Sequence, residues 1–169
     1  MDLSRLLSIE PLQWSAIGAA LLCGFIIGLE RQIRGKPVGV RTSSLIVLST
    51  YVFVSLAMSV NNNMTDPSRI IGQVVTGVGF LGAGVMLAKG GMVLGVTSAA
   101  TIWVLASVGV CIAVGGLSIA VKLSIIVVIV LAGVDLLEDY IQKVTRVTQE
   151  TLVRWKGKER REKKRWEEF

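Results

Sequence analysis

The chain of 169 residues is 52% hydrophobic, has a mean hydropathy of +0.65 and carries a formal net charge of +6. It contains no histidine, and no Asp or Glu lies between Asp66 and Asp135. These absences exclude the usual zinc site, proton relay and catalytic triad. We therefore predict a protein that is not an enzyme and that holds no metal ion or cofactor.

Long apolar runs dominate the sequence. Residues 11–29, 42–65, 70–88 and 90–121 contain no Asp, Glu, Lys or Arg, and a bilayer core requires a helix of about 20 mainly apolar residues. We predict an all-α membrane protein in which residues 1–137 form a bundle of five transmembrane helices. The predicted spans are about 12–30, 43–60, 70–88, 95–113 and 117–136, with the turn Gly115-Gly116 between the last two. In an alternative with four spans, the glycine-rich segment 70–88 is re-entrant.

Basic residues favour one side of this bundle. Arg31, Arg34, Lys36 and Arg41 follow the first span, and ten Lys and Arg lie in the tail, residues 138–169. The positive-inside rule then places the C-terminus in the cytoplasm and the N-terminus outside. Met1 to Glu10 lacks the basic start of a cleavable signal, so the first span is expected to stay in the membrane. The tail is expected to form a short basic helix, either on anionic lipid or against another subunit, and not to bind nucleic acid.

The glycines of the third span need an explanation. Gly77, Gly79 and Gly82 match a dinucleotide-binding pattern, but no acidic residue follows at the required distance, so that interpretation fails. Small residues instead allow membrane helices to pack closely. The predicted packing residues are Gly24 and Gly28, which continue a face with Ala16 and Ala20, and Gly77, Gly79, Gly82 and Gly84. We expect a third helix packed on both sides, and a homo-oligomer, such as a dimer, built on either of these helices.

Polar residues gather at two places. At the inner boundary, Glu30 and Arg41 are expected to form a charge pair within a functional polar cluster. Its other members are Arg31, Thr42, Thr97, Thr101 and Asp135, with Ser98 beside them; the alternative is that all are ordinary interfacial residues. At the outer boundary, Asp66 followed by Pro67 predicts a capped helix start. Arg69 and Gln73 then continue along one face of that helix, which capping alone does not explain.

Three motifs in order carry a family resemblance: "GLERQIRGKPVGVRT", "DPSRIIGQVVTGVGFLGAG" and "GVTSAATIWVLASVGV". They resemble the MgtC/SapB family of bacterial membrane proteins over roughly residues 15–135. The resemblance implies a five-helix domain in the bacterial inner membrane. Its motif residues, carried over by position, are Glu30, Arg31, Arg41, Thr42, Asp66, Arg69, Gln73, Thr97 and Thr101.

The same resemblance implies a role in growth at low magnesium and in virulence. It implies a regulator of another membrane complex, the ATP synthase being the example, with a transporter or channel for magnesium or another small ion as the alternative. The best-known members carry an ACT-type cytoplasmic domain after the last span, where this chain has its basic tail of about 32 residues. The function of that domain is therefore not expected here.

Overall fold

The computed structural model describes residues 8–60, 66–89 and 91–137, so the predictions for the tail, residues 138–169, lie outside the described residues. The chain divides into two units, Met1–Ile129 and Val130–Phe169. The first unit holds nearly all the described residues, and its packing is given below. Of the second unit, the structure describes only the last turns of the helix Leu117–Leu137.

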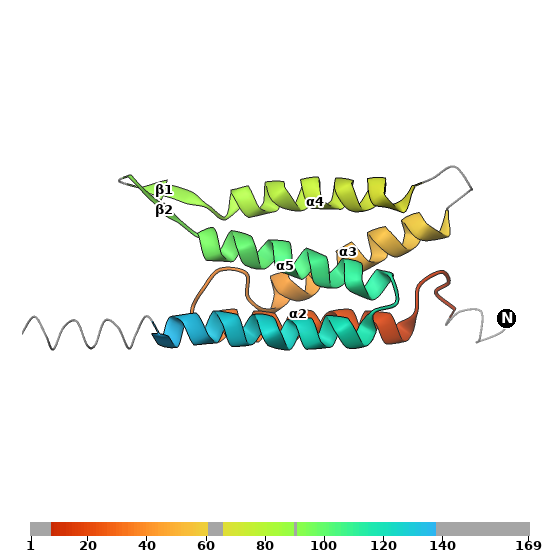
Figure 1. Ribbon diagram of the computed structural model, residues 1–169, viewed down its shortest axis with the longest axis horizontal. Coiled ribbons are helices and arrows are strands. Elements are labelled where there is room, and N and C mark those ends of the chain that lie inside the picture. The colour runs from red at the N-terminus through yellow and green to blue at the C-terminus, as the bar shows by residue number, and fades with distance from the viewer. Residues whose placement is uncertain (1–7, 61–65, 90, 138–169) are drawn as a thin grey trace, which may run out of the picture. The chain divides into compact units, whose positions relative to one another are not determined.

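The described elements are mostly helical. In chain order they are α2 (Trp14–Ile33), α3 (Val40–Ser59), α4 (Pro67–Gly84), β1 (Leu87–Lys89), β2 (Met92–Leu94), α5 (Val96–Ala113) and the helix Leu117–Leu137 (Figure 1). Four of these helices are long and apolar enough to cross a membrane: α2, α3, α5 and Leu117–Leu137. The predicted helical membrane protein is thus confirmed, and Gly115-Gly116 does separate the last two helices. The fifth predicted span is not confirmed, because α4 is not among the four.

The prediction was wrong about the end of the third helix. A helix was expected through residue 88, but α4 ends at Gly84, and β1 pairs with β2 as a short antiparallel hairpin. The turn contains Gly91 with a φ of +81°, a conformation that favours glycine. The sequence "KGG" therefore marks a hairpin turn here, and Gly95, with a φ of +88°, precedes α5.

Glycines allow α2 and α3 to pack closely. A methyl group on Gly28 would lie 2.6 Å from the Cα atom of Val40, and one on Gly24 would lie 2.8 Å from the backbone nitrogen of Ser44. Further along α3, a methyl group on Gly109 of α5 would lie 2.6 Å from the Cβ atom of Thr50. Helix α3 thus packs closely on both α2 and α5 through contacts that larger residues would prevent.

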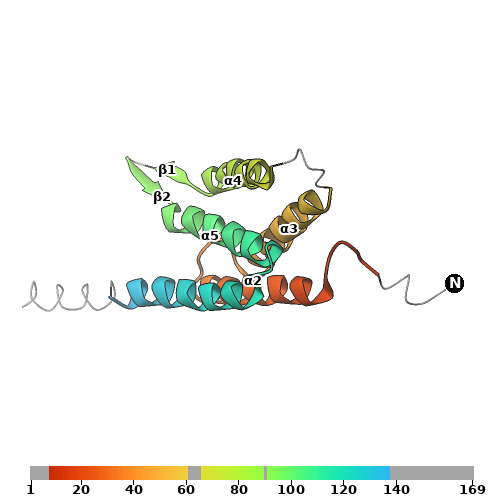
Figure 2. The ribbon, with the colours of Figure 1, turned by 45° about the vertical axis from the view of Figure 1, so that its right-hand side comes forward.

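The packing of α4 differs from the prediction. It runs antiparallel beside α5, with Gly82 contacting Ala99 near the start of α5 (Figures 1 and 2). A methyl group on Gly77, Gly79 or Gly84 would meet no atom within 4 Å. Within one chain α4 is therefore packed on one side, not on both, and three of its four predicted packing glycines contact no neighbouring helix.

Candidate functional site

A buried arginine lies at the end of α2. The buried face of this helix passes through Ala20 and Ile27 and reaches Arg31, whose side chain is only 2% exposed. Its Nη2 atom donates a hydrogen bond of 3.0 Å to the Oγ atom of Ser98, in the first turn of α5. The Nε atom of Arg31 has no hydrogen-bond partner among the described residues. A charge this deeply buried is costly unless hydrogen bonds satisfy it, so Ser98 fixes the position of Arg31.

Glu30 is also buried, and its charge partner is not the predicted one. The Nε atom of Arg34 lies 2.7 Å from Oε1 of Glu30, whose side chain is 7% exposed. Neither carboxylate oxygen of Glu30 accepts a hydrogen bond from the described residues, so the contact with Arg34 is an ion pair. The predicted partner, Arg41, is exposed in the first turn of α3. The error came from ending the first helix at residue 30: α2 continues to Ile33, which places Arg34 one turn beyond Glu30.

The connection between α2 and α3 is held by local hydrogen bonds. Helix α2 ends in a Schellman motif, in which Lys36 N–H donates to the carbonyl of Arg31 and Gly35, at a φ of +63°, donates to Gln32. Val38 then has a φ of +68°, which is rare for a β-branched residue. The hydroxyl of Ser43 donates a bond of 2.9 Å to the carbonyl of Val38 and holds it there.

The predicted threonines divide between the interior and the surface. Thr101 is buried and donates a hydrogen bond of 2.8 Å to the carbonyl of Thr97, while the side chains of Thr97 and Thr42 are exposed. Asp135 belongs to the second unit, outside the body that holds Arg31. The buried cluster in the first unit therefore consists of Glu30, Arg31, Ser98 and Thr101, and we call it the Arg31 cluster.

At the opposite end of the first unit, the structure has the predicted cap. The Oδ1 atom of Asp66 accepts a hydrogen bond of 2.8 Å from Ser68 N–H, and Oδ2 accepts one of 2.7 Å from the Ser68 hydroxyl. These bonds, with the nearby charge of Arg69, hold the pKa of Asp66 below its ordinary value. Arg69 and Gln73 are exposed, and the side of α4 that carries Gln73 borders a groove against α3.

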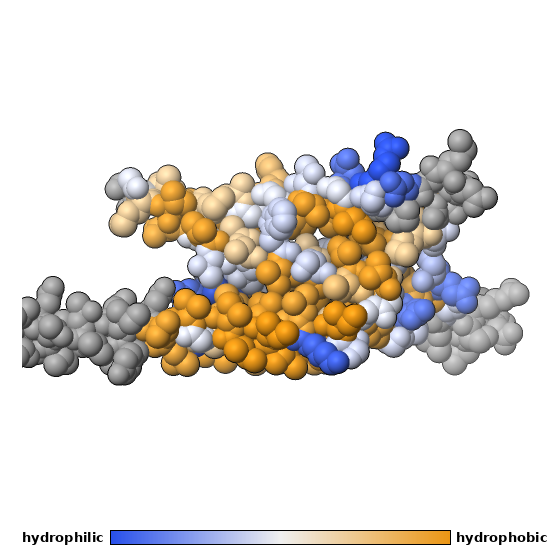
Figure 3. Space-filling model, in the orientation of Figure 1, coloured by the Kyte–Doolittle hydropathy of each residue, from blue (hydrophilic) through white to orange (hydrophobic). Residues whose placement is uncertain are grey.

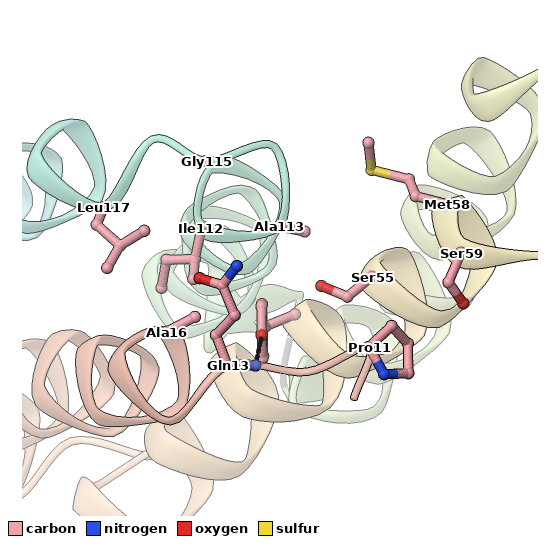
Figure 4. A pocket seen from close by; sticks show the side chains of 11 residues that line it. Pro11, Gln13, Ala16, Ser55, Met58, Ser59, Ile112, Ala113, Gly115 and Leu117 are labelled. Carbon is pink, nitrogen blue, oxygen red and sulfur yellow. Dashed lines mark hydrogen bonds between the residues drawn. The ribbon is translucent and has the colours of Figure 1, made fainter. Parts of the chain in front are cut away.

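The described part of the first unit contains cavities away from the Arg31 cluster. One, of about 280 Å³, lies where α2 begins and α3 and α5 end; Gln13 N–H donates a bond of 3.0 Å to the Tyr51 hydroxyl at its wall (Figure 4). Another is an apolar groove of about 430 Å³ between α3 and α4, lined by residues that include Phe53, Gly77 and Leu81. Neither cavity is lined by a residue of the Arg31 cluster. Among the residues that the structure describes, no three His, Cys, Asp or Glu side chains converge on a metal site.

The sequence motifs that contain the Arg31 cluster and the Asp66 cap match a known family. Residues 17–140, more than half of the chain, match the profile of the MgtC family. The chain belongs to the MgtC family. The resemblance stated from the motifs is thereby confirmed.

Individual relatives agree with this assignment. The chain is 42% identical over 120 residues to the "Putative magnesium transporter YhiD" of Escherichia coli K12, covering 67% of this chain and 55% of that protein. It is 40% identical over 109 residues to "Protein MgtC" of Salmonella typhimurium LT2, covering 64% of this chain and 46% of that one. The chain thus spans about half the length of the curated relatives it matches. No solved structure gives a significant match.

Proposed function

We propose that this MgtC-family protein is a regulator that binds another complex in the bacterial cell membrane and limits its activity during growth at low magnesium and in virulence. The membrane ATP synthase is the complex we propose to test. The observation that carries the proposal is the distribution of charge inside the first unit.

Among the described residues of that unit, buried charge is confined to the Arg31 cluster. Glu30 is the one buried carboxylate in the described part of the chain, and two arginines, Arg31 and Arg34, accompany it. The other buried polar side chains of the described helices, such as Thr50 and Ser124, are hydroxyls. A magnesium ion retains several waters and binds through carboxylates, and its desolvation in an apolar interior is very costly. This arrangement favours a protein that binds a partner over one that conducts magnesium.

A transporter is the second candidate. It is favoured by the carboxylate oxygens of Glu30, which accept no hydrogen bond from the described residues and so have capacity for a cation. The name of the YhiD relative points the same way. In this case Glu30 would be the cation ligand, and Arg34 would have to move away from it.

Reconstitution separates the two functions. Vesicles with ATP synthase, with and without this protein, are assayed for ATP-driven acidification, and vesicles with this protein alone are assayed for magnesium uptake with an enclosed dye. We expect acidification to fall as the protein is added and magnesium uptake to equal that of empty vesicles. Uptake that is lost in Glu30→Gln but kept in Arg41→Ala, the exposed control, would establish the transporter and refute the proposal. Unchanged acidification would exclude the ATP synthase as the partner.

A further inference from the structure

The outward face of α4 carries a regular seam of residues. Arg69, Gln73, Thr76, Phe80 and Ala83 are all exposed, and they follow one another at intervals of four, three, four and three residues. This is the 3.5-residue period of helices that pair along a seam. The buried Val78 and Gly82 lie on the other side of α4, which faces the bundle. The seam therefore points away from α5, and at its edge Gln73 also lines the groove between α3 and α4.

The seam lies at the depth of helices that can cross a membrane. Gly82 is beside Ala99 at the start of α5, and the groove beside α4 is lined from Ile46 to Phe53 of α3, so α4 extends alongside both apolar helices (Figures 1 and 2). The space-filling view shows paler, more hydrophilic surface over α4 than over the helix Leu117–Leu137 (Figure 3). Polar side chains at this depth rarely face lipid, because hydrocarbon offers them no hydrogen bonds. The amide of Gln73, in the second turn of α4, is therefore better matched by a protein partner than by lipid, whereas Arg69 lies in the first turn near the charge of Asp66.

The backbone of α4 is open to a close neighbour on this face. Gly72 and Gly79 flank the seam on one side, and Gly77 and Gly84 flank it on the other. None of the four would place a methyl group within 4 Å of another atom. Phe80, which is 82% exposed, is a large apolar side chain between these glycines. Such a surface suits a second helix with the same alternation of large and small residues.

We propose that a second copy of this chain covers the seam, with the two α4 helices parallel about a two-fold axis. The face is self-complementary: a glutamine side chain both donates and accepts, so two copies of Gln73 at the axis can form reciprocal hydrogen bonds. Asp66 and Arg69 attract each other within one chain. The positive charge of each Arg69 is therefore partly neutralised where the two copies meet. Phe80 of each copy would pack over Gly77 of the other, next to the apolar groove.

Disulfide scanning tests this arrangement in the full-length chain. In a background with Cys23→Ala and Cys111→Ala, single cysteines are placed at Gln73 and Phe80 on the seam and at Ile126, an exposed control on another helix. After oxidation in membranes, we expect covalent homodimers from the two seam positions and little from Ile126. Monomers at all positions, equal cross-linking at Ile126, or cross-links from the seam to a different protein would each overturn the proposal, since lipid or another partner would then cover the seam.

A second measurement examines Gln73 without cysteines. The dimer dissociation constant in detergent is measured for the wild type, Gln73→Leu and Gln73→Asn. We expect Gln73→Leu to weaken the dimer by about threefold to twentyfold, the range that interhelical hydrogen bonds in membranes give, and Gln73→Asn to retain most of the affinity. Because Gln73 is exposed in one chain, both variants should keep the helix content of the wild type. A dimer that Gln73→Leu leaves unchanged would refute the role of this side chain.

Discussion

Replacing Gly28 with alanine tests the close contact between α2 and α3. In a helix interior, alanine is favoured over glycine by about 1 kcal/mol, but forcing a methyl group into a packed region costs about 1–3 kcal/mol. At Gly28 the methyl group would lie 2.6 Å from the Cα atom and 2.9 Å from the nitrogen of Val40, which are backbone atoms that cannot rotate away. We therefore expect Gly28→Ala to have the larger cost, with a net loss of up to about 2 kcal/mol.

Gly18 provides a matched control in the same helix. A methyl group there would meet no atom within 4 Å, so Gly18→Ala should leave stability unchanged or raise it by up to about 1 kcal/mol. The free energy of unfolding is measured for both variants in mixed micelles of a mild detergent and dodecyl sulfate. The difference between the two variants, about 1–3 kcal/mol, isolates the packing cost because helix propensity cancels. Equal effects of the two substitutions would refute the close packing of α2 on α3.

Three further predictions concern charged and polar side chains. A double-mutant cycle with Arg31→Met and Ser98→Ala should give a coupling of about 1.5–3 kcal/mol in the free energy of unfolding, the value of a hydrogen bond to a charged group; additive effects would exclude the bond. A cycle with Glu30→Gln and Arg34→Gln should give a coupling above the about 0.5 kcal/mol of an exposed pair, since Glu30 is buried. The pKa of Asp66 is lowered in the folded protein, so its contribution to helix stability is present above the ordinary value of 3.8 and is lost as pH falls through the folded value. Amide exchange at the start of α4 should therefore rise below about pH 4 in the wild type but not in Asp66→Asn, and identical pH profiles would contradict the cap.

The apolar helices could be predicted well from the sequence, and the buried contacts less well. Charge-free runs and Gly115-Gly116 gave the positions of α2, α3, α5 and the helix Leu117–Leu137 to within about three residues, because hydrophobicity over a whole helix is a strong signal. The end of α2 was misplaced because Glu30 and Arg31 interrupt the apolar run, although the helix continues. That error concealed Arg34, which lies four residues beyond Glu30 on the same face.

Other features had weaker signals or none. The positive φ of Val38 depends on the hydroxyl of Ser43 from the next helix, and a β-branched residue gives no hint of it. Ser98 was visible as a polar residue at the start of α5, but only the packing of α5 on α2 makes it the partner of Arg31. The glycines of α4 were predicted to be packing residues, but of the four only Gly82 lies against a neighbouring helix, because a sequence pattern does not show which glycines of a helix face a neighbour.

The hydrogen bond between Arg31 and Ser98 joins residues 67 positions apart, and this separation matters while the protein is being made. At roughly 5–20 residues per second, several seconds pass between the synthesis of the two side chains. During that interval the long side chain of Arg31 can extend to water and lipid headgroups at the end of α2. Its hydrogen bond can form only when α5 has inserted beside α2. A chain that lacks α5 has no Ser98 to accept this hydrogen bond, so the final position of Arg31, at the end of the first long helix, is set only after most of the described chain has been synthesised.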